Sequence, residues 1–298
     1  MEVRKPIWTS SSVLLYAGGF AVLVSALGSL AYLSSSYGKG ALVAWSLLPL
    51  IVLLVVARSL RARGEWVAAG VFAFSWVAVW IAFLGLLFSW WGWTDTTATG
   101  FFRGWHWALW AVEVLTIAVA TVVRRTFRFP LVSVYILVGS YLLVTDVISG
   151  GGSWSAFVTL VIGLVYLAVG VSVDGGSRRP YGFWWHLVSG LLVGGALLFW
   201  WHSSETDWAL LATSSVVFML IAGATWRSSW AVLGAIGFLA ASTHWTIEWV
   251  SGGLFSLSTP ARTWVPFVVL AVVGFFFVAL GLYVGWRRGR HAPASLAA

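Results

Sequence analysis

Long hydrophobic runs alternate with short polar stretches along the whole chain. A helix needs about 20 consecutive apolar residues to cross the hydrocarbon core of a bilayer. Ten runs reach or approach this length, and the second contains Pro49. We therefore predict an all-α fold, a polytopic transmembrane bundle of about ten helices. The runs cover residues 13–33, 41–57, 66–90, 106–123, 131–148, 154–173, 183–201, 208–224, 230–250 and 265–286.

The basic residues between the runs fall mostly on one side of the predicted membrane. Cytoplasmic loops of membrane proteins carry an excess of Lys and Arg. We therefore predict a multi-pass protein of the bacterial inner membrane with both termini in the cytoplasm. The predicted cytoplasmic side holds Arg4, Lys5, Arg58, Arg61, Arg63, Arg124, Arg125, Arg128, Arg178, Arg179, Arg227, Arg287, Arg288 and Arg290, and the outer side holds Lys39, Arg103 and Arg262.

The composition agrees with this pattern and excludes several classes of protein. Of the 298 residues, 60% are hydrophobic and only 9% are charged, whereas soluble domains carry about 25% charged residues. We therefore exclude a soluble enzyme, a disordered chain and a nucleic-acid partner. The chain has no cysteine, which excludes disulfides, thiolate metal sites and cysteine nucleophiles.

The order of short motifs predicts an internal duplication. The fifth run ends with the acid-x-x-Ser-Gly-Gly motif at 146–151, and the ninth ends with the same motif at 248–253. Other pairs of runs match in the same order. We predict two leading helices (1–63) followed by two four-helix repeats (64–180 and 181–298). Parallel repeats of this kind occur in some transporters, although the alternative is that the duplication only enlarges the bundle.

Small residues mark where helices can approach one another closely. Gly190 and Gly194 form a GxxxG step, as do Gly281 and Gly285. Such steps favour close helix packing. We expect packing within one chain, with dimerisation as the alternative.

Ionisable residues inside the runs are the candidates for function, because they are costly in a membrane. His244 and Glu248 share one helical face, and small residues at Gly237 and Ala241 extend that face. The pair can line a cavity, bind a proton or supply two metal ligands. The alternative is a hydrogen-bonded pair that helps one helix to pack.

Glu113 is the acid predicted to lie deepest in the membrane, and His106 lies on the same helical face. Asp146 occupies the position in the first repeat that Glu248 occupies in the second. Glu113 is either a functional carboxylate or a neutral group bonded to a threonine or a backbone carbonyl.

The predicted topology collects many ionisable residues at outer helix ends. An acidic, histidine-bearing vestibule follows if the helix faces converge, and it would attract cations or protons. His186 is the exception, near a cytoplasmic end. The outer residues are Asp95, His106, Asp146, His202, Glu205, Asp207, His244 and Glu248. The 23 tryptophans gather at the same ends, either as an interfacial belt or as a cation-binding cage.

Common catalytic motifs are absent from the sequence. It holds no GxxxxGK[ST] loop, no HExxH and no GxSxG, and no lysine lies inside a run. We therefore assign no catalytic residue. Haem ligated by His106, His202 or His244 stays open because imidazoles are axial ligands. A metal ion held by His244 and Glu248 also stays open.

Residues 11–45, 57–70 and 227–245 resemble bacterial polytopic membrane proteins of unknown function. The resemblance implies an inner-membrane protein and carries no functional residue across. Together these features predict a transporter-like protein that binds a small solute or cation from the outer side, with proton coupling through Glu113, His244 and Glu248. One alternative is a non-catalytic subunit, anchor or sensor that contacts lipid and other membrane subunits. Another is a haem or metal protein.

Overall fold

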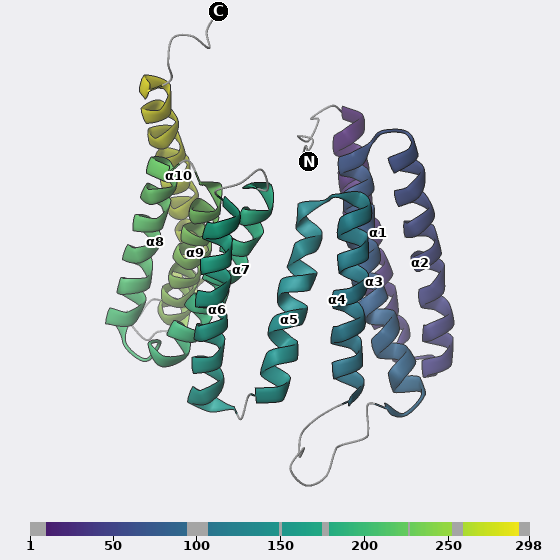
Figure 1. The fold of residues 1–298 in the computed structure, drawn as a ribbon. Coiled ribbons are helices and arrows are strands. Elements are labelled where there is room, and N and C mark those ends of the chain that lie inside the picture. Colours follow the sequence, from purple (N-terminus) through teal and green to yellow (C-terminus); the bar gives the residue numbers. More distant parts are fainter. Residues whose placement is uncertain are drawn as a thin grey trace, which may run out of the picture. The chain divides into compact units, whose positions relative to one another are not determined.

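The computed structural model describes residues 10–93, 107–148, 151–174, 179–225, 227–251 and 259–291. Within these residues the chain forms ten α-helices and one short 3₁₀-helix, η3 (Figure 1). Their bounds are α1 Ser10–Leu33, α2 Lys39–Ala62, α3 Trp66–Trp90, α4 Trp107–Phe127, η3 Pro130–Val132, α5 Ser133–Ile148, α6 Gly152–Asp174, α7 Arg179–Trp200, α8 Glu205–Thr225, α9 Ser228–Ser251 and α10 Thr259–His291.

Each predicted run corresponds to one of these helices. Ten candidate spans in the described part of the chain are long and apolar enough to cross a membrane, which is consistent with a multi-pass membrane protein. The second helix is longer than predicted, at 24 residues, and continues through Pro49. Proline removes one backbone hydrogen bond, but the strongly apolar sequence on both sides keeps this helix continuous.

The chain divides into two compact units, Met1–Val188 and Ser189–Ala298. The division lies inside α7, and each unit is described by itself below. The predicted duplication into residues 64–180 and 181–298 is a separate matter and stays a prediction.

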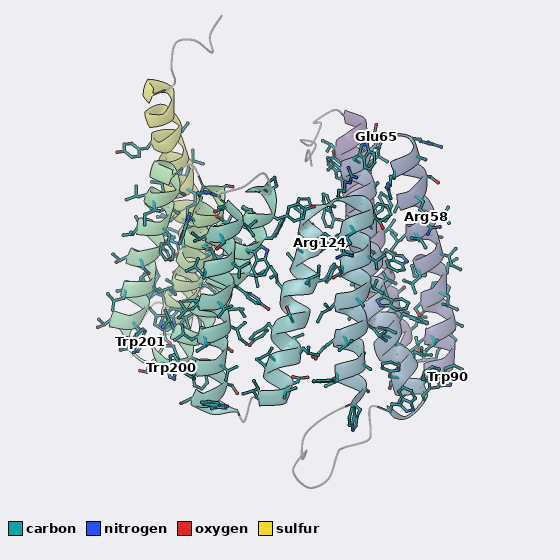
Figure 2. The ribbon with its side chains drawn as sticks, viewed as in Figure 1. Arg58, Glu65, Trp90, Arg124, Trp200 and Trp201 are labelled. Carbon is teal, nitrogen blue, oxygen red and sulfur yellow. The ribbon has the colours of Figure 1, made fainter. Side chains whose placement is uncertain are left out.

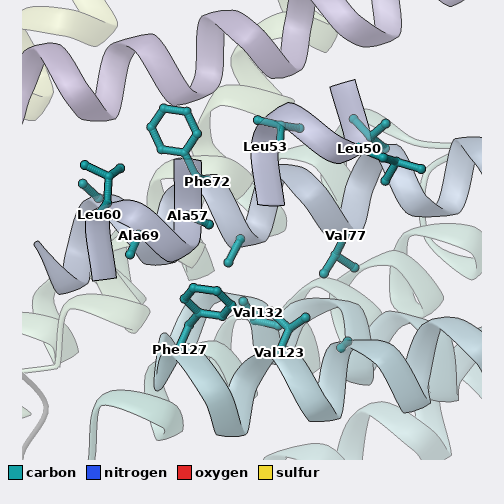
Figure 3. Close-up of a cluster of buried hydrophobic side chains, with 14 of the residues drawn as sticks. Leu50, Leu53, Ala57, Leu60, Ala69, Phe72, Val77, Val123, Phe127 and Val132 are labelled. Atoms are coloured by element: carbon teal, nitrogen blue, oxygen red, sulfur yellow. The ribbon is translucent and has the colours of Figure 1, made fainter. Parts of the chain in front are cut away.

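Helix α3 forms the centre of the first unit. Its side chains pack on α2, α4 and η3, where Leu53, Ala69, Val77 and Ala120 have almost no exposed surface (Figure 3). Alanine and valine dominate this interface, so the helix backbones lie close together. Small residues, and not polar ones, therefore allow these helices to pack closely.

Glycine makes the closest contact of α3 possible. A Cβ at Gly70 would lie 2.3 Å from Cγ of Phe129, the residue just before η3. No side chain fits there. The Phe129 ring therefore rests directly on the backbone of α3.

In the second unit, α9 packs against α8 through glycines. A Cβ at Gly234 would lie 2.5 Å from the carbonyl oxygen of Ser215 in α8, and Gly237 faces the same serine. Helix α10 packs on α9 through stacked rings of Phe238 and Phe276, with centroids 4.9 Å apart.

The first GxxxG step is used unequally in the second unit. A Cβ at Gly190 would lie 2.4 Å from the side chain of Leu233. The absence of a side chain at Gly190 therefore lets α9 of the same chain pack closely against α7. Gly194 and Gly281 have open space around them. Close packing within one chain therefore explains one of these three glycines.

The two ends of the first unit differ in chemistry. Arg58, Glu65 and Arg124 lie at one end, which we call the arginine end, and Trp90 lies at the other, which we call the tryptophan end (Figure 2). Helix α4 runs from the tryptophan end to the arginine end, α5 returns, and α6 runs back to the arginine end (Figure 1).

Candidate functional site

Glu113 lies on the packed face of α4. The buried residues of this helix recur every three or four positions, at Ala108, Glu113, Thr116, Ala120 and Val123, which is the spacing of one helical face. Glu113 therefore points into the first unit and is only 8% exposed.

Helix α5 brings a second carboxyl group to Glu113. Gly139 of α5 has no side chain where it faces Ile117, and a Cβ there would lie 3.0 Å from that isoleucine. This close approach lets the carboxyl group of Asp146, near the carboxyl end of α5, interact with that of Glu113. We call Glu113 and Asp146 the carboxyl pair.

Two ionised carboxylates side by side repel each other, and one proton shared between them relieves this repulsion. Asp146 is exposed at the surface of the protein chain, whereas Glu113 is buried. The pair therefore joins a buried acid to an accessible one.

Buried oxygens beside the carboxyl pair have no hydrogen-bond partner. Oε2 of Glu113 and Oγ1 of Thr116, one turn along α4, are both completely buried and unbonded. Unpaired buried oxygens are uncommon, because each loses its hydration without compensation. These two atoms can accept a proton donor or a cation.

The other predicted site, on α9, meets the first residue of α8. Nε2 of His244 lies 3.3 Å from Oε1 of Glu205, the first residue of α8. Nε1 of Trp245 donates to Oε2 of the same glutamate at 2.8 Å. The His244 ring stacks on Trp208 at 4.1 Å. Glu205 therefore lies beside His244, and the joint role predicted for His244 and Glu248, which lies one turn further along α9, stays a prediction.

The small residues on this face of α9 form a helix contact. Gly237 faces Ser215 of α8, and Ala241 is fully buried. At these two positions the face packs against protein instead of lining a cavity.

One buried ionisable pair was not predicted from the sequence. Nε2 of His186 in α7 lies 2.6 Å from Oδ2 of Asp174, the last residue of α6, and their side chains are 4% and 10% exposed. A Cβ at Gly182 would lie 2.2 Å from Oδ1 of Asp174. Only the close packing of α6 and α7, which this glycine permits, creates the pair.

Other predicted candidates are dispersed or lie outside the described residues. Asp95 and His106 fall in the segment 94–106, which the structure does not describe. Nδ1 of His202 lies 2.9 Å from the carbonyl oxygen of Leu198, and Asp207 accepts a hydrogen bond from the backbone of Ser204 at the start of α8. Among the described residues, no group of three or more His, Cys, Asp or Glu side chains could hold a metal ion.

Comparison of the chain with protein-family models, with curated proteins and with solved structures found no match.

Proposed function

We propose that this chain is a transporter-like membrane protein that couples the passage of a small solute or cation to the release and uptake of a proton at the carboxyl pair. The supporting observation is the buried carboxyl group of Glu113, which has an unpaired oxygen and interacts with the carboxyl group of Asp146. Ionisable groups inside membrane helices commonly mark proton relays and ion pathways.

The chemistry of the pair suits an exchange. Losing its single proton leaves two negative charges side by side near the unpaired oxygen of Thr116. Either a proton or a hard cation can neutralise them, because carboxylate and hydroxyl oxygens bind both. A site that binds protons and cations alternately can use the gradient of one to move the other in the opposite direction.

The position of the pair sets the direction of access. Glu113 lies about 9 Å from the start of α4, at 1.5 Å per residue. It therefore sits in the half of α4 nearer the tryptophan end, which the charge distribution predicts to face outward. We expect protons and cations to reach the pair from that side through Asp146.

The experiment is cation-driven proton movement in proteoliposomes. Purified protein is reconstituted with a pH-sensitive dye inside, and an outward Na⁺ or K⁺ gradient is imposed. We expect the wild type to acidify the lumen, because cations that leave in exchange bring protons in, and Glu113→Gln and Asp146→Asn to lower the rate by about 100-fold, as expected when a proton-transfer group is removed. Glu65→Gln is the matched control, because Glu65 is exposed at the start of α3 and has no side-chain capping bond.

Infrared spectroscopy reports the proton itself. A protonated carboxyl has a carbonyl stretching band that a carboxylate lacks. We expect this band in the wild type and in Glu65→Gln, and its loss in Glu113→Gln. The proposal is wrong if Glu113→Gln keeps both the band and the proton flux of the wild type.

A further inference from the structure

Hydroxyl groups join α5 to α6 in the interior of the first unit. The hydroxyls of Tyr141 and Thr159 lie 3.0 Å apart, and those of Ser140 and Tyr166 lie 2.8 Å apart. The Tyr166 hydroxyl also donates to the carbonyl oxygen of Leu137 at 2.9 Å. A hydroxyl both donates and accepts, so each can take one proton while it passes on another. We call Ser140, Tyr141, Thr159 and Tyr166 the polar seam.

The polar seam continues toward the His186–Asp174 pair along a single face of α6. Thr159, Tyr166, Gly170 and Asp174 follow at intervals of seven, four and four residues, which keeps them on one side of a helix. A Cβ at Gly170 would lie 3.3 Å from Nδ1 of His186. The missing side chain at this glycine lets the imidazole reach the face that carries the seam.

The line of polar groups has the length of a membrane crossing. From Thr159 to Asp174 the helical rise is about 22 Å, and Asp146 lies about 7 Å beyond Tyr141 along α5. Together these span about 30 Å, the thickness of the hydrocarbon core. The carboxyl pair stands at one end and the His186–Asp174 pair at the other.

We infer that the polar seam is a proton path between the carboxyl pair and His186, with Asp174 stabilising the imidazolium that forms. This inference rests on the proposed function. In one direction, the carboxyl pair gives up its proton to the seam, and each hydroxyl accepts a proton on one side and releases its own on the other. The imidazole of His186 takes the last proton, and the carboxyl pair regains one from the tryptophan end. The reverse sequence returns the proton.

Three steps of the path are longer than a hydrogen bond. From Tyr166 to the level of His186 the path covers one turn of α6, about 6 Å, and the step from Asp146 to Tyr141 is similar. The third step lies within the polar seam, from the Tyr141–Thr159 pair to the Ser140–Tyr166 pair, since each pair is bonded within itself. Water molecules bridge separations of this kind. The Tyr166 ring also meets the Trp185 ring edge-on at 5.3 Å, which holds this tyrosine beside the residue that precedes His186.

Few other charges lie near the path. Helix α3 has no ionisable side chain from Trp66 to Trp90. At the arginine end, the guanidinium of Arg124 lies over the ring of Tyr181 in α7, 5.8 Å from its centroid. Between the two ends, the described helices α4, α5 and α6 contribute only tyrosines as titratable groups.

Two tyrosines provide a matched test. Tyr166→Phe removes a hydroxyl of the seam, whereas Tyr135→Phe removes a hydroxyl that donates to the carbonyl of Phe74 in α3, away from the seam. In the proteoliposome assay we expect Tyr166→Phe to lower proton flux by about tenfold or more, and Tyr135→Phe to match the wild type. His186→Gln should show the same loss as Tyr166→Phe.

Infrared spectra separate this inference from the proposed function. The carboxyl pair of Tyr166→Phe should keep its protonated band, because the variant blocks transfer and not binding. If the wild type and Tyr166→Phe move protons equally, the path is wrong while the proposed function stands. If the wild type moves no protons under any cation gradient, both are wrong.

Discussion

Polar residues of this chain satisfy their hydrogen bonds in two ways, according to side-chain length. Many serines on helices bond backward to their own helix, as Ser46 does to the carbonyl of Val43 at 2.7 Å, although Ser75 of α3 donates to the carbonyl of Gly19 in α1. Tyrosines reach across to a neighbouring helix, as Tyr135 does to Phe74 at 3.2 Å. Short hydroxyls therefore mostly satisfy their hydrogen bonds locally, and the long ones tie helices together in a chain without asparagine or glutamine.

Gly70 should be intolerant of even one added carbon. A methyl group at Gly70 would overlap the ring of Phe129, at 2.3 Å from Cγ. Overpacking of this kind costs about 1–3 kcal/mol. We expect Gly70→Ala to lower the thermal midpoint of the protein in detergent by several degrees, measured by the loss of its folded, monodisperse fraction on heating.

The matched control lies in the same helix. Gly85 has nothing within 4 Å of a Cβ, and alanine is the better helix former. Gly85→Ala should leave the thermal midpoint unchanged or raise it. Equal midpoints for the two variants would contradict the packing of Phe129 on α3.

Helices of this protein differ widely in how much protein surrounds them. In an apolar stretch of α3 long enough to cross a membrane, 44% of the residues are buried, compared with 6% in the corresponding stretch of α10. Helix α3 is held by α1, α2 and α4, whereas α10 contacts mainly α9. The exposed large side chains of α10, such as Phe275 at 76%, suit a helix that faces lipid on most sides.

The α6–α7 hairpin depends on the pair at its end. His186 and Asp174 are both buried and 2.6 Å apart. Removing one partner of a buried hydrogen bond leaves the other group unsatisfied, which typically costs about 1–3 kcal/mol. We expect Asp174→Asn to lower the thermal midpoint clearly, as followed by the near-ultraviolet circular dichroism of the tryptophans.

Asp207→Asn is the matched control for this hairpin. Asp207 accepts one hydrogen bond from the backbone of Ser204, and an asparagine oxygen can accept the same bond. A thermal midpoint of Asp174→Asn as high as that of Asp207→Asn would show that the buried pair does not hold the hairpin together.

At the scale of the whole molecule, the orientation of the chain in the membrane is testable with single cysteines. The natural sequence has none, so each introduced thiol reports one site. We expect a membrane-impermeant thiol reagent applied to intact cells to label Ser36→Cys and Ser203→Cys, and to label Glu65→Cys and Ser228→Cys only after lysis. All four positions are exposed, and each unit contributes one on either side.

The opposite labelling pattern would place both termini outside. Labelling of Ser36→Cys together with Ser228→Cys would show that the two units are inserted in opposite senses, which contradicts the parallel duplication.

The sequence by itself determined the secondary structure and the choice of most ionisable candidates. Ten apolar runs became ten helices, because an uninterrupted apolar run of this length satisfies its backbone hydrogen bonds only within itself. Glu113 was recognisable because a single acid in an apolar run stands out whatever its neighbours. The sequence could not show which side chain it meets, since that depends on how each helix is rotated about its axis.

Only the tertiary structure decided which side chains the ionisable residues contact. Gly139 brings Asp146 to Glu113, Gly182 makes room for Asp174 beside His186, and the approach of α8 to α9 brings Glu205 to His244. Helix contacts inside a membrane are selected by the local fit of small residues, because lipid and side chains are equally apolar. That fit has no periodicity along the chain, so the pairs became visible only once the helices were packed.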